Sequence, residues 1–270
     1  MNTAVALHGR RITIGVEHPL LVPLVNRLFR PYSVTTGART EPDYRVGGDS
    51  AAGWWVAGGS RGRTAFETAA QAVDDLEYRL TLHLLGFAAD HPHLHASGAV
   101  IDGRAVLAVG PSGAGKSSLA LAWSTSGYRV LGDDIALLER HGRVTPFARL
   151  FGVPTGLLSA CGVPADEDLD PLAGDGESWF DPARAGGWAD PDPIPVAIVA
   201  AIRHRADPAT VIRDLPASEI VALLVGSLLE SGRPPADSFD AISELAVVAR
   251  GVHVTYGDPA NASAALAAAV

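Results

Sequence analysis

The residues with the clearest chemical potential form a glycine-rich stretch near the middle of the chain. Residues 110–117 read Gly-Pro-Ser-Gly-Ala-Gly-Lys-Ser, which matches the Walker A pattern G-x-x-x-x-G-K-[ST]. Glycines allow backbone angles that turn consecutive N–H groups inward, and those groups form a nest for phosphate oxygens. The predicted nucleotide-binding residues are Gly110, Pro111, Ser112, Gly113, Ala114, Gly115, Lys116, Ser117 and Ser118.

Lys116 strengthens this prediction, because it is the only lysine among the 21 basic residues of the chain. A compact ammonium group fits inside a tight loop, where the planar fork of an arginine does not. We expect Lys116 to contact the outer phosphates and the hydroxyl of Ser117 to bind Mg²⁺.

A pair of carboxylates, Asp133 and Asp134, follows the apolar strand predicted at residues 128–131. In phosphoryl transfer one carboxylate typically holds Mg²⁺ and another accepts the proton of the attacking hydroxyl. Two adjacent aspartates supply both groups, so the sequence favours a phosphotransferase over nucleotide binding alone.

Hydrophobic periodicity places these residues on predicted elements. A β-branched strand at 105–109 precedes the loop, and a helix that ends before Gly127 follows it. Strand-like patterns also occur at 95–101 and 196–202, and residues 135–147 resemble a hairpin. The predicted elements of the C-terminal part are helices at 217–229 and 239–250, a strand at 252–256 and an alanine-rich helix from Pro259.

The same patterns predict an α/β protein with two parts. Residues 1–92 combine short strands with one long amphipathic helix at 64–90, which indicates an α+β lobe. Residues 93–270 form the predicted catalytic domain, with a mixed sheet. Within it, residues 162–195 are acidic and rich in proline and glycine, and we expect them to be a flexible loop or lid.

Composition limits the classes of partner. The chain has 270 residues, 47% of them hydrophobic and 19% charged, which is ordinary for a globular protein. The formal net charge of −9 argues against nucleic acid or an anionic membrane as the main partner. No apolar run reaches the ~18 residues of a membrane helix, so we expect a cytoplasmic protein.

His95, the phosphate loop and the two aspartates together resemble the catalytic domain of the HPr kinase/phosphorylase family. Members of that family share a P-loop fold with phosphoenolpyruvate carboxykinases, and they carry a histidine on the strand before the loop and an aspartate pair after the loop helix. The resemblance covers residues 93–150 well. It implies that Lys116 and Ser117 are the phosphate and Mg²⁺ contacts, that Asp133 is the catalytic base and that Asp134 supports the metal. It also implies that His95 lies near the transferred phosphate.

The chain departs from the bifunctional members of that family after the predicted hairpin. Residues 148–154 read Ala-Arg-Leu-Phe-Gly-Val-Pro, with no glutamate in the place of a motif resembling E-x-R-G-x-G. A closer likeness is to short HPr-kinase-like proteins of modified-peptide pathways, some of which phosphorylate a serine of a peptide.

The resemblance therefore implies a kinase that uses ATP and Mg²⁺ to phosphorylate a hydroxyl, with serine of a peptide or small protein as the leading acceptor. Two alternatives stay open: a kinase of a small-molecule hydroxyl, such as an amino acid or a sugar, and a non-catalytic nucleotide-binding module. Homo-oligomerisation, which occurs in the resembling family, also stays open.

Two further sets of residues are candidates for a role. Arg149, Arg203 and Arg205 lie near predicted strand ends and could neutralise a migrating phosphoryl group. The alternating residues His91, His93 and His95 could instead face one side of a strand and bind a transition metal.

Overall fold

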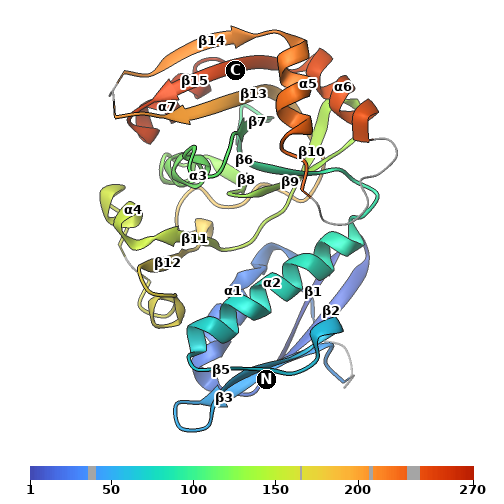
Figure 1. Cartoon of the computed structure of the whole chain (residues 1–270), viewed down its shortest axis with the longest axis vertical. Helices are drawn as coiled ribbons and strands as arrows, with labels where there is room; N and C mark the ends of the chain where they lie inside the picture. Colours follow the sequence, from blue (N-terminus) through green and yellow to red (C-terminus); the bar gives the residue numbers. More distant parts are fainter. Residues whose placement is uncertain (36–40, 165, 207–208, 230–237) are drawn as a thin grey trace. The chain divides into compact units, whose positions relative to one another are not determined.

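The computed structural model describes the whole chain except residues 36–40, 165, 207–208 and 230–237 (Figure 1). Its internal contacts divide the chain into two compact units. Unit 1 comprises Met1–Ala88 and Gly152–Phe180, and unit 2 comprises Ala89–Phe151 and Asp181–Val270.

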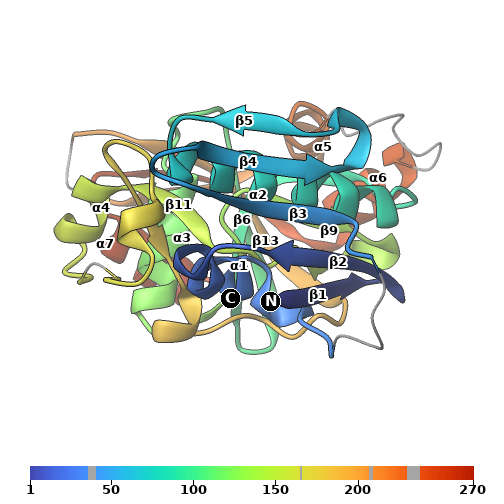
Figure 2. The same cartoon turned by 90° about the horizontal axis from the view of Figure 1, so that it is seen from below.

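Unit 1 is built on a five-stranded sheet with the strand order β1-β2-β3-β4-β5 (Figure 2). The strands are β1 (Asn2–Leu7), β2 (Arg10–Val16), β3 (Tyr44–Asp49), β4 (Gly53–Gly58) and β5 (Thr64–Phe66). Short helical segments follow β2 and β4, namely η1 (Pro19–Leu21), α1 (Val22–Leu28), η2 (Arg30–Tyr32) and η3 (Gly59–Arg61).

The helix α2 (Ala69–Phe87) packs against this sheet. It begins with a capping box, in which the Thr68 hydroxyl accepts from the N–H of Gln71 and the Gln71 side chain accepts from the N–H of Thr68. Residues at spacings of three and four turn inward, and Leu76, Leu80 and Leu84 are fully buried. The long helix predicted at 64–90 is therefore present, but it starts five residues later because 64–66 form β5.

The remaining segment of unit 1 contains β11 (Phe151–Pro154), α4 (Thr155–Ala160), η5 (Asp170–Leu172) and β12 (Glu177–Phe180). Arg27 of α1 forms ion pairs with Asp166 at 2.9 Å and with Asp168 at 3.1 Å. The buried indole N–H of Trp179 donates to the carbonyl of Leu172. Residues 162–195 therefore contain short ordered elements, and their first part groups with unit 1 and not with the predicted catalytic domain.

Unit 2 is built on an eight-stranded mixed sheet with the order β10-β9-β6-β7-β13-β15-β14, with β8 also paired to β6. The strands are β6 (His93–Ile101), β7 (Arg104–Val109), β8 (Arg129–Gly132), β9 (Ile135–Leu138), β10 (Arg143–Pro146), β13 (Ile194–His204), β14 (Val211–Leu215) and β15 (Arg250–Tyr256). The pairs β7–β13 and β13–β15 are parallel, and the other pairs are antiparallel. The predicted α/β class with a mixed sheet is confirmed.

Helices cover both faces of the central strands of unit 2, which explains why Ala105–Val109 are fully buried at every position. The helices are α3 (Lys116–Thr125), α5 (Ala217–Val225), α6 (Ser238–Val248) and α7 (Pro259–Ala267), with η4 (Arg140–Gly142) and η6 (Pro182–Arg184) between strands. Helix α3 packs on β6, β7 and β8 and against α7.

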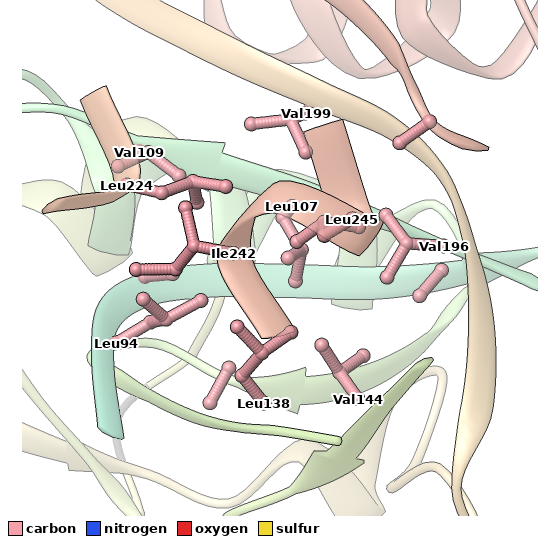
Figure 3. Packing of buried hydrophobic residues seen from close by; sticks show 14 of the residues in the cluster. Leu94, Leu107, Val109, Leu138, Val144, Val196, Val199, Leu224, Ile242 and Leu245 are labelled. Atoms are coloured by element: carbon pink, nitrogen blue, oxygen red, sulfur yellow. The ribbon is translucent and has the colours of Figure 1, made fainter. Parts of the chain in front are cut away.

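The core under α5 and α6 shows how the strand register serves the packing (Figure 3). Ile242 and Leu245 of α6 lie among side chains from the sheet, including Leu107 of β7. Val196 and Val199 are three residues apart and would lie on opposite faces of a regular strand. Both belong to this cluster because β13 has an irregular register between Val196 and Ile198.

In the part of the chain that the structure describes, no helix is both long enough and apolar enough to cross a membrane.

Candidate active site

The glycine-rich loop connects β7 to α3, which is the strand, loop and helix order that the motif requires. Gly113 has a φ of +77° and Gly115 a φ of +100°, in the region that favours glycine. Gly110 is different, because the reason for glycine there is space: a Cβ would lie 3.0 Å from the carbonyl oxygen of Ile202. Gly110 therefore serves close packing, whereas Gly113 and Gly115 serve the backbone angles of the loop.

Lys116 begins α3 and is 6% exposed. Its Nζ donates to the carbonyl oxygens of Gly110 at 2.9 Å and Pro111 at 3.3 Å, so the ammonium group lies within the loop. Burial lowers the pKa of Lys116, and the negative charges of Asp134 and Asp133 act against that shift. The loop lysine is therefore close enough to the aspartate pair to be influenced by both carboxylates.

Tyr256, at the end of β15, holds the last peptide of the loop. Its hydroxyl donates to the carbonyl oxygen of Gly115 at 2.9 Å, and the same oxygen accepts the first helical hydrogen bond, from Leu119. A Cβ on Gly115 would collide with the Tyr256 hydroxyl. Burial raises the pKa of Tyr256 to about 12, so the phenol stays a donor at neutral pH.

The aspartate pair lies between β8 and β9, which pair with successive parts of β6. The N–H of Ala96 on β6 donates to the Asp134 carbonyl, which fixes the pair beside His95. The preceding Gly132 permits a close backbone approach, since a Cβ there would lie 2.8 Å from the carbonyl oxygen of Phe147. That approach brings the segment containing Arg149 next to the aspartates.

Asp134 forms the centre of a charged cluster. Its Oδ1 lies 2.8 Å from Nδ1 of His95, and its Oδ2 lies 3.5 Å from Nη2 of Arg149. Burial by itself raises the pKa of the Asp134 carboxyl, but the hydrogen bond and charge of His95 and the charges of Arg149 and Lys116 outweigh it, so the pKa lies below its usual range. Asp134 is therefore ionised at neutral pH.

Asp133 has a different environment from its neighbour. It is 5% exposed, and its Oδ1 lies 4.0 Å from Nη2 of Arg149, which is an ion-pair distance longer than a hydrogen bond. The two carboxylates thus differ in exposure and in their distance from Arg149, which is 3.5 Å for Asp134 and 4.0 Å for Asp133.

Two clefts adjoin the loop in unit 2. The first, which we call the α5 cleft, has a volume of about 550 Å³ and is lined by His95, Gly110, Pro111, Ser112, Ala222, Leu223, Gly226, Ser227 and Leu228. The second, which we call the β13 cleft, has a volume of about 470 Å³ and is lined by Val109, Gly110, Pro111, Ser112, Gly113, Ala114, Ala201, Ile202, Arg203, His204, Leu223 and His253. The loop therefore separates an almost uncharged cleft from one with a cation and two imidazoles.

The other candidate residues lie in different places. Arg149 joins the aspartate cluster and Arg203 lines the β13 cleft, whereas Arg205 is exposed and donates its backbone N–H to the carbonyl of Tyr256.

The three alternating histidines do not share one carboxylate. His91 lies 3.1 Å from Glu139, so His91 and His95 face separate carboxylates. Among the described residues no group of three or more His, Cys, Asp or Glu side chains suits a metal ion, so the structure gives no support to the three-histidine site.

Sequence reasoning did not single out His204, Ser227, His253 or Tyr256. The backbone carbonyl of Ser227 accepts from the N–H of His95 at 2.7 Å. His204 and Tyr256 lie at the carboxyl ends of the parallel strands β13 and β15, next to the loop that follows β7. Ligands of α/β sheets bind at this edge, and that rule was the available signal for these two residues.

The residues present fit a nucleotide triphosphate and Mg²⁺. A Cβ on Gly113 would meet no atom within 4 Å, so the nest is open above this residue. The hydroxyl of Ser117 and the ionised carboxylate of Asp134 are hard oxygen ligands, which Mg²⁺ prefers.

Comparisons with known proteins give little beyond these observations. No family model matches the chain, and no curated protein sequence does. One matching solved structure is that of the HPr(Ser) kinase/phosphatase from Coxiella burnetii, with 16% sequence identity, a TM-score of 0.32, and coverage of 65% of this chain and 91% of that chain. A similarity of this size shows neither the family nor the function, so the chemistry rests on the residues of this chain.

Proposed function

We propose that the protein is a kinase that uses ATP and Mg²⁺ to transfer the γ-phosphoryl group to a hydroxyl, with serine of a peptide or small protein as the acceptor. The supporting observation is that the aspartate pair and the loop adjoin the same point of β6: the N–H of Ala96 donates to the Asp134 carbonyl, and Ala96 pairs with Val109, the last residue of β7 before the loop. A phosphate-binding cation and two carboxylates of unlike environment are thus gathered in one place, as phosphoryl transfer requires.

The loop and the two residues Ser117 and Asp134 have separate proposed roles, in phosphate binding and in metal binding. The loop N–H groups and Lys116 hold the phosphates, and Lys116 gives up its contacts to the Gly110 and Pro111 carbonyls when phosphate oxygens arrive. Ser117 and Asp134 would hold Mg²⁺, which when bound neutralises phosphate charge.

Asp133 is the proposed base. Asp134 is unsuited to that role, because His95 and Arg149 keep its pKa low. Asp133 is 5% exposed, and its Oδ1 lies 4.0 Å from Nη2 of Arg149, so it is a second carboxylate beside the same cation.

The reaction balances with one proton transfer. A bond forms between the acceptor oxygen and the γ-phosphorus, while the bond from that phosphorus to the bridging oxygen of ADP breaks. The hydroxyl proton passes to the Asp133 carboxylate. His95 Nδ1 lies against the Asp134 carboxylate, which orients the ring, and Nε2 is then left to contact a phosphoryl oxygen or the acceptor.

The test is radiolabel transfer from ATP labelled at the γ-phosphate to a mixture of serine-containing peptides, measured for the wild type, Lys116→Ala and Asp133→Asn. We expect Asp133→Asn to lower the turnover number by about 100-fold to 10,000-fold, the range of general base catalysis. Lys116→Ala should weaken nucleotide binding as well as transfer, because it removes a phosphate contact.

Binding of a fluorescent ATP analogue and thermal unfolding are the controls. Asp133→Asn should bind the analogue as the wild type does and should unfold at a similar temperature. Full transfer activity in Asp133→Asn would remove the base assignment, and nucleotide binding without transfer to any acceptor would favour the non-catalytic module.

A further inference from the structure

The α5 cleft exists because β6 changes its partner. Along Ala96–Ile101, β6 pairs with β7, and the pair Ala96–Val109 is the last before β7 leaves into the loop. Beyond that point Leu228 forms a bridge with Leu94 in the place of β7. The strand edge therefore splits between the loop and the segment after α5.

His95 lies at this split. Its N–H donates to the Ser227 carbonyl at 2.7 Å, and the N–H of Leu229 donates to the His93 carbonyl at 2.9 Å. The backbone on that side of the cleft is therefore fixed. His95 reaches the cleft while its Nδ1 stays on Asp134, so the cleft adjoins the proposed reaction centre.

The charge of the lining limits what the cleft can hold. Among its described lining residues, His95 is the only one with an ionisable side chain. The Ser227 hydroxyl donates to the Leu223 carbonyl at 2.7 Å. A free amino acid or a sugar phosphate would bring charged groups that find no ionised partner among the lining residues that the structure describes, and burying such groups is costly.

The wall opposite the loop is apolar. Ala222 is exposed, and Leu223 and Leu228 are half-buried, so all three retain surface that a ligand can cover. A volume of about 550 Å³ exceeds the space that one serine side chain needs. The cleft thus has room for the residues on either side of an acceptor serine.

We infer that the α5 cleft binds the acceptor as a peptide segment, with the serine hydroxyl at His95 and uncharged, apolar neighbouring residues against Ala222 and Leu223. This inference rests on the proposed kinase function and names the substrate class of the same site. It favours a peptide acceptor over a charged small metabolite such as a free amino acid.

The first test uses the full-length protein, ATP, Mg²⁺ and a library of peptides in which the residues flanking a central serine are varied. Free serine and simple sugars are assayed in parallel. We expect alanine, valine and leucine next to the serine to be enriched in the phosphorylated products. Aspartate, glutamate, lysine and arginine there should lower kcat/KM at least about tenfold, since a buried charge without a partner is unfavourable.

Introducing a positive or a negative charge at Ala222 tests whether this residue contacts the residues that flank the acceptor serine. Ala222→Arg should shift the preference toward acidic neighbours and Ala222→Glu toward basic ones, whereas loss of folding would produce no such opposite shifts. The matched control is Val225→Arg on the same helix, because Val225 is 45% exposed and does not line the cleft. We expect this control to keep the wild-type preference.

The outcomes separate the two proposals. Transfer with no preference for uncharged neighbours, faster transfer to free serine or a sugar, or unchanged preference in both Ala222 variants would overturn the acceptor site and leave the kinase intact. Binding of nucleotide with no transfer to any acceptor would overturn the kinase proposal, and the acceptor site with it.

Discussion

Two adjacent aspartates acquire different chemistry from their surroundings. Asp134 contacts His95 and Arg149, and these partners keep its carboxyl ionised. Asp133 is more buried and its cation is farther away. Sequence adjacency therefore does not imply equivalent environments, and the proposed division into a metal ligand and a base rests on the neighbours that each side chain contacts.

Tyr256 provides a test at the residue scale. At about pH 8, Tyr256→Phe should lower the free energy of unfolding by about 1 kcal/mol, because the hydrogen bond to the Gly115 carbonyl is lost. Burial raises the pKa of Tyr256 in the folded protein to about 12, above the ordinary value of about 10 in the unfolded chain. Its stabilising contribution is therefore present below about pH 10 and is lost as the pH rises toward 12. By pH 11 the wild type should have lost about 1 kcal/mol more than the variant.

Urea unfolding of both proteins between about pH 8 and pH 11 measures this difference. The other tyrosines are common to both chains and cancel in the comparison. Parallel loss of stability in the two proteins would show that Tyr256 does not ionise differently in the folded and unfolded states.

At the scale of the elements, the loop depends on β15 as well as on its own sequence. The peptide that joins the loop to α3 is held by Leu119 from within the helix and by Tyr256 from the neighbouring strand. The nest is thus positioned in part by the tertiary contact with Tyr256. The glycines in the nest differ in which neighbouring atoms they approach.

Substitution by alanine should distinguish two of these glycines. Gly113→Ala adds a Cβ that meets no atom within 4 Å, so only backbone strain of about 1–2 kcal/mol is expected. Gly115→Ala adds the same kind of strain and a collision with the Tyr256 hydroxyl, so it should destabilise the protein by a larger amount.

The double variant Gly115→Ala/Tyr256→Phe supplies the control. Removing the hydroxyl relieves the collision, so part of the lost stability should return, although the ring carbon Cζ remains 3.2 Å from the new Cβ. Chemical unfolding gives the free energy of unfolding of the wild type, Gly115→Ala, Tyr256→Phe and the double variant. Strictly additive effects would argue that the two side chains do not meet.

For the whole molecule, the division into two units predicts that a core substitution in one unit lowers the local stability of that unit more than that of the other. Leu76 is fully buried on α2 in unit 1, and Leu76→Ala should cost about 2–5 kcal/mol of local stability. Hydrogen exchange should accelerate in residues 1–88 and 152–180, because these segments share the contacts of that unit.

Nucleotide binding should change little in this variant, since the phosphate loop belongs to unit 2. The measurements are amide exchange by mass spectrometry and titration with a fluorescent ATP analogue. Acceleration spread evenly over both units would contradict the division.

The sequence predicted those parts of the fold that local patterns encode. The strand, loop and helix around Lys116 follow from an apolar run, a glycine motif and a helical run that are contiguous in the chain. The aspartate pair beside His95 was also foreseeable, but as a resemblance and not from periodicity.

Contacts between segments far apart in the sequence could not be predicted from local sequence patterns. Residues 152–180 join unit 1 through contacts such as Arg27 with Asp166, which no local pattern reveals. Arg149 reaches the aspartates because the chain near Phe147 approaches Gly132. The exposed strand β14 (Val211–Leu215) was missed because its burial does not alternate clearly.

The single lysine also gives the molecule one cleavage point for a lysine-specific protease. That point lies where the phosphate loop becomes α3, and the Lys116 residue is 6% exposed. A protease needs an extended, accessible chain, so the folded loop should resist the cut and an opened loop should accept it. Proteolysis at this one bond therefore reports, without any label, how often the loop around Lys116 unfolds.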